Sequence, residues 1–234
     1  QQFCFVMGNK LLDKQLYQNA KLGIGGLTMP NHCNNYITIK GEDKEVIRFL
    51  VTITNDVPEG EQFAIMNNLY PCPKELELDM SPFRGSDKES ELKELYERNE
   101  AKYGYKDWYD WNIANWGSKW GDYTGRINWN GKVDDHYEVR LSFTTAWSPI
   151  TEGITHISSQ FPTLQFLYTF EEGGMGFIGG VAIQNGEQLT DLATDYPYVT
   201  DCDDDGFFDT DKQEEQIDAV INDINKQLQG AFSG

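Results

Sequence analysis

The residues whose type and spacing best suit chemistry are the carboxylates between Asp201 and Asp209. The stretch reads Asp-Cys-Asp-Asp-Asp-Gly-Phe-Phe-Asp, so carboxylates fall at positions 1, 3, 5 and 9 and glycine at position 6. Hard oxygen ligands at alternating positions around a sharp turn are what a calcium loop provides. The spacing therefore predicts a calcium site, and calcium is the one cofactor expected. Its ligands would be Asp201, Asp203, Asp205 and Asp209.

Two features of this segment depart from a calcium loop. Position 12 is Lys212 where the loop needs a bidentate glutamate, and Tyr196-Pro197 is incompatible with an ordinary entering helix. The alternative interpretation is a solvated acidic turn that caps the last helix. Both interpretations stay open from the sequence.

Charge is the second strong signal, because the net charge is −19. Phosphate contacts need clustered Lys and Arg, so direct binding to nucleic acid or to an anionic membrane is excluded. The simpler interpretation is an acidic surface that prevents association, and the sharper one is a surface that imitates a polyanion and attracts a basic partner. In the second case the acidic segment carries the contact, and the residues expected beside the loop carboxylates are Asp204, Asp211, Tyr196, Tyr198, Phe207 and Phe208.

Other motifs give no catalytic assignment. The sequence has no GxSxG, HExxH or P-loop pattern, and a zinc site from His32, Cys33 and Cys72 has no recognised spacing. The glycines at 173–180 follow an expected strand without a helix after them, which favours close strand packing over a phosphate cradle. Glu171 and Glu172 cannot be given acid or base roles without geometry. We therefore expect a binding protein and not an enzyme.

A tryptophan-rich segment precedes the second half of the chain. Residues 108–120 hold four tryptophans and one tyrosine, and a further tryptophan of interest lies at 147. One interpretation is an exposed aromatic surface that binds a partner. We favour the other, in which large indoles plug the open side of a sheet. The structural aromatics are then Trp108, Trp111, Trp116, Trp120 and Trp147.

Hydrophobic periodicity predicts the elements that position these residues. Alternation predicts strands over 35–41, 137–145, 164–170 and 175–183, with a hairpin at Asn185-Gly186 and a possible further strand over 63–69. Helical spacing predicts a helix from Glu42 with Val46, Ile47 and Leu50 on one face, and others over 86–103 and from Ser148-Pro149. A last helix carries an apolar stripe that must dock, on the parent sheet or on a second protomer: Ile217, Val220, Ile221, Ile224 and Leu228.

Three segments carry a family resemblance: Pro30–Gly41, the tryptophan-rich segment and Phe143–Pro149. Together they resemble the YubB-like, or Api-type, ferredoxin-like domain of tailed phages and conjugative plasmids, a family without an assigned biochemical function. The resemblance implies an α+β fold, a ferredoxin-like antiparallel sheet with helices on one face. We expect this domain over residues 29–190 with a helical, aromatic insertion at 71–130. Residues 1–28 would be a leader or arm, and 191–234 an acidic loop plus a C-terminal helix.

Composition and family together give the functional expectation. No apolar run reaches the roughly 18 residues that span a bilayer, and four scattered cysteines favour reduced thiols in a cytoplasm. We expect a non-enzymatic accessory protein of a phage or mobile element that binds a basic surface of a bacterial host protein. The alternative is a virion or assembly component, stabilised by calcium and contacting neighbours or forming a homo-oligomer.

Overall fold

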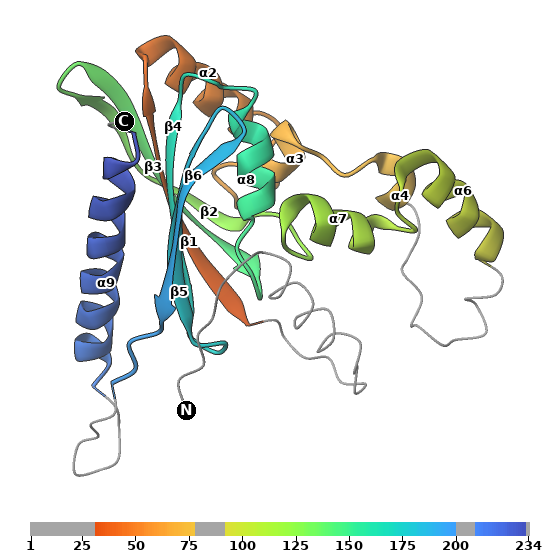
Figure 1. The fold of residues 1–234 in the computed structure, drawn as a ribbon. Coiled ribbons are helices and arrows are strands. Elements are labelled where there is room, and N and C mark those ends of the chain that lie inside the picture. The colour runs from red at the N-terminus through yellow and green to blue at the C-terminus, as the bar shows by residue number, and fades with distance from the viewer. Residues whose placement is uncertain (1–30, 78–91, 200–208, 233–234) are drawn as a thin grey trace. The chain divides into compact units, whose positions relative to one another are not determined.

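The computed structural model describes residues 31–77, 92–199 and 209–232, and a six-stranded antiparallel sheet lies at its centre (Figure 1). The strands lie in the order β2-β3-β1-β4-β5-β6. Their bounds are β1 (His32–Gly41), β2 (Tyr123–Val133), β3 (His136–Ala146), β4 (Gln165–Glu172), β5 (Phe177–Gln184) and β6 (Glu187–Asp195). The described helices are α2 (Asp43–Ile53), α3 (Ile65–Leu69), α4 (Lys74–Glu77), α6 (Lys93–Tyr103), α7 (Trp108–Trp116), α8 (Thr151–Ser158) and α9 (Thr210–Gly230).

The first four strands have the ferredoxin-like topology that we expected. The chain runs β1, α2, β2, β3, α8, β4, and the four strands lie in the order 2-3-1-4. A β5–β6 hairpin then extends the sheet beyond β4, through the predicted turn at Asn185 and Gly186, whose φ angles are 50° and 78°. The connection from α2 to β2 holds α3, α4, α6 and α7. The α+β fold class is therefore confirmed.

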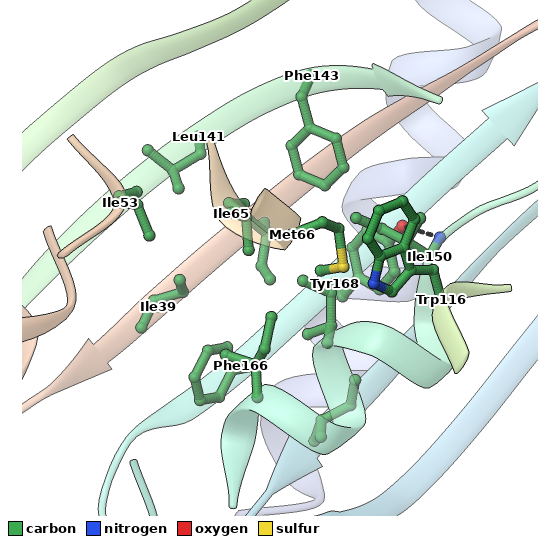
Figure 2. Packing of buried hydrophobic residues seen from close by; sticks show 14 of the residues in the cluster. Ile39, Ile53, Ile65, Met66, Trp116, Leu141, Phe143, Ile150, Phe166 and Tyr168 are labelled. Carbon is green, nitrogen blue, oxygen red and sulfur yellow. Dashed lines mark hydrogen bonds between the residues drawn. The ribbon is translucent and has the colours of Figure 1, made fainter. Parts of the chain in front are cut away.

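Strand alternation separates the two faces of the sheet. Ile37 of β1 pairs with Leu141 of β3 and Tyr168 of β4, and all three side chains enter the main hydrophobic core. Figure 2 shows this core between the sheet and the helical segments, with Met66 of α3 and Trp116 of α7 among the packed side chains. Tyr36 and its neighbours at alternate positions face the opposite side.

The last helix covers part of that opposite side. Ile224 and Leu228 of α9 form a second, smaller core with Leu167 of β4 and with Ile178 and Ala182 of β5. Figure 1 shows α9 along the side of the sheet away from α2 and α8. The expectation that the final apolar stripe docks on the parent sheet is thus confirmed.

A tyrosine hydroxyl joins three elements inside the main core. The hydroxyl of Tyr168 donates to Oδ1 of Asn35 at 2.6 Å and accepts the backbone N–H of Ile150 at 2.9 Å. The Asn35 amide in turn donates to the Thr145 hydroxyl at 2.9 Å. Tyr168 and Asn35 are fully buried, so these bonds satisfy polar groups that water cannot reach.

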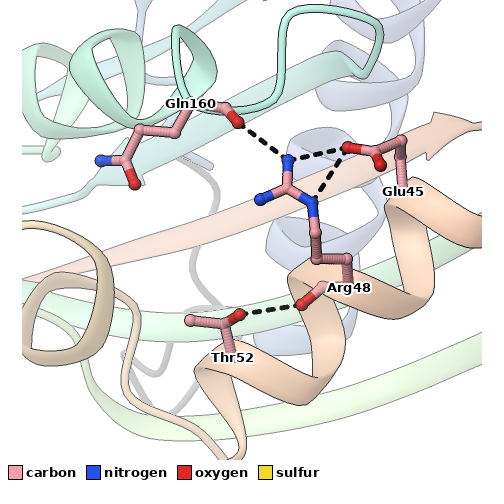
Figure 3. A network of polar contacts seen from close by, with 4 residues as sticks. All are labelled: Glu45, Arg48, Thr52 and Gln160. Carbon is pink, nitrogen blue, oxygen red and sulfur yellow. Dashed lines mark hydrogen bonds and ion pairs between the residues drawn. The ribbon is translucent and has the colours of Figure 1, made fainter.

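An arginine links α2 to the end of α8 (Figure 3). The Arg48 guanidinium donates to Glu45 at 2.7 Å and to the backbone carbonyl of Gln160 at 2.8 Å, and its carbon lies 3.9 Å from the centre of the Phe161 ring. The guanidinium therefore combines an ion pair with a stacking contact, which fixes the two helices on the same face.

Three local predictions are wrong. The 63–69 segment is not a strand, because Asp122 accepts the backbone N–H groups of Ile65 and Met66 at 2.8 Å each and thereby begins α3. The α8 helix begins at Thr151 without a Ser148 cap, since the Ser148 hydroxyl donates to Gly117 instead. On α2, Ile47 is 46% exposed, and the buried residues are Val46, Phe49 and Ile53.

The predicted 86–103 helix is confirmed in its second half. The described helix α6 covers Lys93–Tyr103 and ends at Gly104, whose φ of 78° is the left-handed C-cap conformation. The start of the predicted helix, residues 86–91, lies outside the described residues. Across the described part of the chain, no helix is long and apolar enough to cross a membrane.

Replacement of Tyr168 by phenylalanine tests the buried hydroxyl. Tyr168→Phe leaves the Ile150 N–H without its partner and leaves Asn35 Oδ1 only the weak thiol donor of Cys33 at 3.9 Å, so we expect a loss of about 1–3 kcal/mol in unfolding free energy by urea titration. Tyr137→Phe is the control, because that hydroxyl makes only an exposed 3.3 Å bond to Asn130. Equal losses in the two variants would contradict the role given to Tyr168.

Close packing of α9 on β5 is tested at Gly180. A Cβ there would lie 2.7 Å from Cγ2 of Ile224 and 2.9 Å from Cδ1 of Leu228, so Gly180→Ala should cost about 1–3 kcal/mol. Hydrogen exchange should show the loss first in α9. At Gly230 a Cβ meets nothing within 4 Å, so Gly230→Ala should leave stability intact. Unchanged exchange in α9 of the Gly180 variant would argue against this packing.

Candidate functional site

Tyrosines and carboxylates gather where β1 and β4 meet the segment after β6 and the first half of α9. We call this the tyrosine–carboxylate surface, and it comprises Tyr36, Glu171, Tyr196, Tyr198, Glu214 and Asp218. Tyr36 comes from β1, Glu171 from β4, and Glu214 and Asp218 from α9. Strand pairing explains part of the arrangement, because Asn34 lies opposite Glu171 and Tyr36 points to the same side as Asn34.

Glu171 is the buried carboxylate of this surface, with 6% of its area exposed. Burial raises the pKa of its carboxyl above the ordinary value, and the charge of Glu172 adds to that effect. Hydrogen bonds from Asn34, at 2.5 Å, and from Tyr196 act in the opposite direction. The side chain is thus an ionisable group that is held partly out of water by tertiary packing.

The second buried carboxylate, Glu172, serves the turn between β4 and β5. It accepts the backbone N–H groups of Gly174, at 3.0 Å, and of Met175. This turn contains the glycines at 173–176, and Gly176 has a φ of 77° that favours glycine. The glycine-rich segment is therefore a β-turn tied to a carboxylate and not a phosphate cradle.

The two tyrosines after β6 pack on that turn. The rings of Tyr196 and Tyr198 lie 4.9 Å apart, and the Tyr198 hydroxyl donates to the carbonyl of Gly173. A Cβ on Gly173 would lie 3.3 Å from the Tyr196 ring, so the absence of a side chain there makes room for the tyrosine. Burial, followed by the charge of Glu171, raises the pKa of Tyr196 to about 12.

A glutamine clamps this segment to α9. The Gln213 side chain donates to the carbonyl of Pro197 at 2.7 Å and accepts the N–H of Val199 at 2.8 Å. These two bonds hold the Tyr196–Val199 backbone against the start of α9. Tyr196 and the α9 carboxylates consequently belong to one fixed surface.

Tyr36 is near enough to three carboxylates for their charges to act on it. It is 38% exposed, and burial raises its pKa, followed by the charges of Glu171, Asp218 and Glu214. Its ring is therefore open to a partner while carboxylates approach it from β4 and from α9. A side chain that carries positive charge would meet an aromatic ring and several carboxylates together.

Of the sequence-predicted site residues, Tyr196 and Tyr198 belong to this surface. Asp211 is exposed on α9, where its spacing to Glu214 and Asp218 of three and seven residues puts it on the same side of the helix. Asp209 is the N-cap of α9, and its side chain accepts the N–H of Lys212 at 2.9 Å.

The remaining predicted residues lie outside the described residues: Asp201, Asp203, Asp204, Asp205, Phe207 and Phe208. The calcium loop accordingly stays a prediction. In residues 31–77, 92–199 and 209–232, no cluster of three or more His, Cys, Asp or Glu side chains could hold a metal ion. Cys33 and Cys72, named for a zinc site, are buried free thiols.

Tyr36, Glu171, Glu214 and Asp218 were not predicted as site residues. Alternation in β1 puts Tyr36 opposite the isoleucines, and helical spacing aligns Asp218 with Asp211, so both could have been noticed. Glu171 could not, because its burial depends on elements far along the chain. The carboxylates of β6 do not join the surface: Asp191 pairs with Val181, whose side chain enters the main core on the other face.

The aromatic side chains of the α7 region occupy a different part of the molecule. Trp111 and Trp116 lie in the main core and their rings meet edge to face at 5.6 Å. Trp120 is 39% exposed and lies 6.0 Å from the half-buried Trp147, whose φ of 64° is unusual for a residue with a side chain.

Comparison with known proteins supports the fold assignment. Residues 127–219 match the family model described as the ferredoxin-like domain in Api92-like protein, a description that names a fold and no reaction. The match runs from β2 into α9 and so includes most of the tyrosine–carboxylate surface, but not Tyr36. No curated protein matches the chain significantly.

One solved structure resembles the chain over most of its length. A crystal structure of the protein Api92 from Yersinia pseudotuberculosis aligns with 74% of this chain and 100% of its own, at 11% identity and a TM-score of 0.42.

Replacement of Glu171 by glutamine tests the burial of its charge. The folded protein holds the Glu171 proton more tightly than the unfolded chain, because its pKa is raised from the ordinary 4.5. Its contribution to stability is therefore largest below that pH and is lost as pH rises through the raised pKa. Glu171→Gln keeps an acceptor for Asn34 and removes the charge, so it should be more stable than the wild type at pH 7.

Urea unfolding between pH 4 and 8 measures this difference. The advantage of the Glu171→Gln variant should shrink as pH falls toward about 4. Glu187→Gln, an exposed position on β6, is the control and should show no such dependence. A variant that is less stable than the wild type at pH 7 would mean that the ionised carboxylate is well satisfied in the fold.

Proposed function

We propose that this protein is a non-enzymatic binding protein of a phage or related mobile element that uses the tyrosine–carboxylate surface to bind a basic surface of a bacterial host protein. The single observation that carries the proposal is that Tyr36 is 38% exposed and near enough to Glu171, Asp218 and Glu214 for their charges to raise its pKa. An arginine or lysine of a partner would contact the ring face and pair with the carboxylates at the same time.

The state of Glu171 supports a cationic partner. An ionised carboxylate that is desolvated by its own fold gains more from a nearby positive charge than one that is already hydrated. A guanidinium that reaches Glu171 would supply the charge that burial lacks, and its planar donors suit a carboxylate. Such a contact favours arginine over lysine in the partner.

The exposed rings supply the apolar part of the interface. Tyr198 is 55% exposed and Tyr36 is 38% exposed, and both lie at positions that the neighbouring backbone fixes. Tyrosine is a frequent binding hot spot because it buries a large ring with few rotatable bonds. The surface thus combines anchors with charge, which an acidic patch alone does not offer.

The wider charge distribution favours rapid association with a basic partner. Residues 187–232 hold thirteen acidic and two basic residues, and the acidic positions of α9 are exposed. A local excess of one sign steers an oppositely charged protein toward the surface and raises the association rate. A basic surface that normally binds nucleic acid fits this description, so the protein would act as a mimic of a polyanion.

A double variant on α9 tests the proposal. Glu214→Gln with Asp218→Asn removes two charges beside Tyr36, and we expect about fivefold to tenfold weaker binding of the captured host protein. The measurement is capture by the tagged full-length chain from a bacterial lysate, followed by titration of the protein retained. Binding should also weaken as NaCl rises from about 0.1 M to 0.5 M.

The matched control removes two charges from another helix. Glu94→Gln with Glu97→Gln on α6 changes net charge equally, away from the tyrosine–carboxylate surface. Capture that falls equally in the two double variants, or that ignores salt, would rule the proposed surface out. A third variant tests the adjacent loop with asparagine at six positions: Asp201, Asp203, Asp204, Asp205, Asp209 and Asp211. Unchanged binding there would remove the loop from the proposal.

A further inference from the structure

The sheet has two edges, and side chains of the same chain occupy part of the outer edge of β2. Glu61 accepts the backbone N–H of Thr124 at 2.9 Å and that of Gly125 at 2.6 Å, and Gln62 accepts the N–H of Ile127 at 2.8 Å. Unpaired N–H groups on an edge strand attract further strands. Side chains that accept these N–H groups therefore protect the β2 edge from such pairing.

The edge at the other end of the sheet, β6, has no such cover among the described residues. β5 pairs with one side of β6, and no described strand or side chain bonds to the backbone on its other side. The register shift in this pair lies opposite Ala182 and Ile183, and Thr190–Asp195 beyond it is paired regularly. This regular part has the length of an ordinary strand and offers its outer backbone groups to a partner.

A groove of about 510 Å³ lies between β6 and α9. Leu192 and Thr194 contribute to it from β6, and Val220 and Ile224 from α9. Leu192 and Val220 are only partly buried, so an apolar side chain beside them would remove more apolar area from water. Side chains of a strand alternate between the faces of its sheet. Every second residue of a strand added to β6 would therefore lie on the side of this groove.

The opposite face of β6 carries negative charge. Asp191 and Asp195 pair with Val181 and Phe177, whose side chains contribute to the main core, so the two aspartates lie on the face away from α9. Neither aspartate has an ion-pair or hydrogen-bond partner among the described residues. Desolvation raises the pKa of the Asp191 carboxyl. Lysine or arginine at the alternate positions of an added strand would supply the missing positive charge.

Charge also decides between a second copy of the chain and another protein. β6 contains three acidic residues and no basic one, so two β6 strands side by side would place like charges close together. The β2 edge of a second copy carries Arg126 and Lys132, but the contacts of Glu61 and Gln62 already occupy part of its backbone. The occupant that fits the β6 edge is therefore a basic segment of a different protein.

We infer that the outer edge of β6 binds, by strand addition, an extended segment of another protein in which apolar and basic residues alternate. Its backbone pairs with Thr190–Asp195, and its apolar side chains enter the groove beside Leu192 and Val220. Its lysines or arginines pair with Asp191 and Asp195. Main-chain hydrogen bonds supply affinity in this mode of recognition, and alternate side chains supply specificity. The site shares no residue with the tyrosine–carboxylate surface, so either proposal can fail without the other.

The probe for this site is a capped peptide of about eight residues in which valine and arginine alternate. It is titrated into the full chain by calorimetry, and backbone hydrogen exchange is followed by NMR. In the free chain, alternate N–H groups of Thr190–Asp195 should exchange quickly, and the bound peptide should slow them. The N–H groups of β2 should not change.

Two further peptides separate strand addition from simple charge attraction. A peptide with the same residues in two blocks, valines and then arginines, should bind at least about tenfold more weakly. Alternating valine and glutamate should give no measurable binding. Equal affinity of the block peptide, or slowed exchange on β2 in place of β6, would overturn the proposal. So would protection of the outer β6 N–H groups in the free chain, which would assign the edge to this chain or, if it depends on concentration, to a second copy.

Two variants locate the contacts of the alternating peptide. Asp191→Asn with Asp195→Asn should weaken its binding about threefold to tenfold, because two ion pairs are lost. Ala219→Arg adds bulk and positive charge to the groove at an exposed position of α9, and should weaken binding at least about tenfold.

The matched control for these variants is Glu94→Gln with Glu97→Gln on α6, which removes the same charge away from β6. This control should retain wild-type affinity within about twofold. Equal weakening in the two double variants would reduce the contact to general charge attraction and exclude the site. Wild-type affinity in the Ala219 variant would exclude the groove.

Discussion

The burial of β4 on both faces is the constraint on which the rest of the structure depends. β1 and β5 pair with its two edges, α8 packs on one face and α9 on the other, and seven of its eight residues are buried. A strand in that position can be apolar throughout, yet this one ends in Glu171-Glu172. The alternation of side chains along the strand places the two carboxylates on opposite faces of the sheet, so each needs its own hydrogen-bond donors. Glu172 accepts hydrogen bonds from the N–H groups of the following turn, and Glu171 accepts hydrogen bonds from the side chains of Asn34 and Tyr196. These two sets of hydrogen bonds hold the end of β4 to the neighbouring turn and segments.

Sequence periodicity predicted the parts of the fold whose information is local. The alternation of β1 and β3, the Asn185-Gly186 hairpin and the apolar stripe of α9 each contain enough residues to identify a face. The errors occur where a distant residue decides. Asp122 caps α3 from 56 or 57 positions away, and Gly117 receives the hydroxyl that was expected to cap α8. No pattern within residues 63–69 shows that a carboxylate will arrive from another segment.

The sequence likewise predicted only the part of the candidate surface whose information is local. The acidic, aromatic composition after β6 identified Tyr196 and Tyr198, because it is a property of neighbouring residues. The place of Tyr36 depends on where α9 lies across the sheet. The helix packs on β4 and β5, which leaves Tyr36 on β1 uncovered and brings Glu214 and Asp218 toward it. That geometry arises from Gly180, where the lack of a side chain lets Ile224 and Leu228 approach the strand. Gly180, which is not itself part of the surface, thus helps to determine where α9 and its carboxylates lie.

Two buried polar groups have a physical feature in common. Glu171 is a carboxylate that its own fold desolvates, and Asn112 Oδ1 is a buried acceptor without a donor among the described residues. Each leaves the folded protein less stable than a fully satisfied group would, so selection for stability alone would favour an apolar residue or a complete network. At Glu171, a partner that supplies positive charge would recover that free energy on binding. Because the cost is already present in the free protein, the recovered part adds to affinity without any rearrangement. A carboxylate that the fold itself desolvates is therefore a more specific argument for the proposed binding surface than the overall charge of the chain.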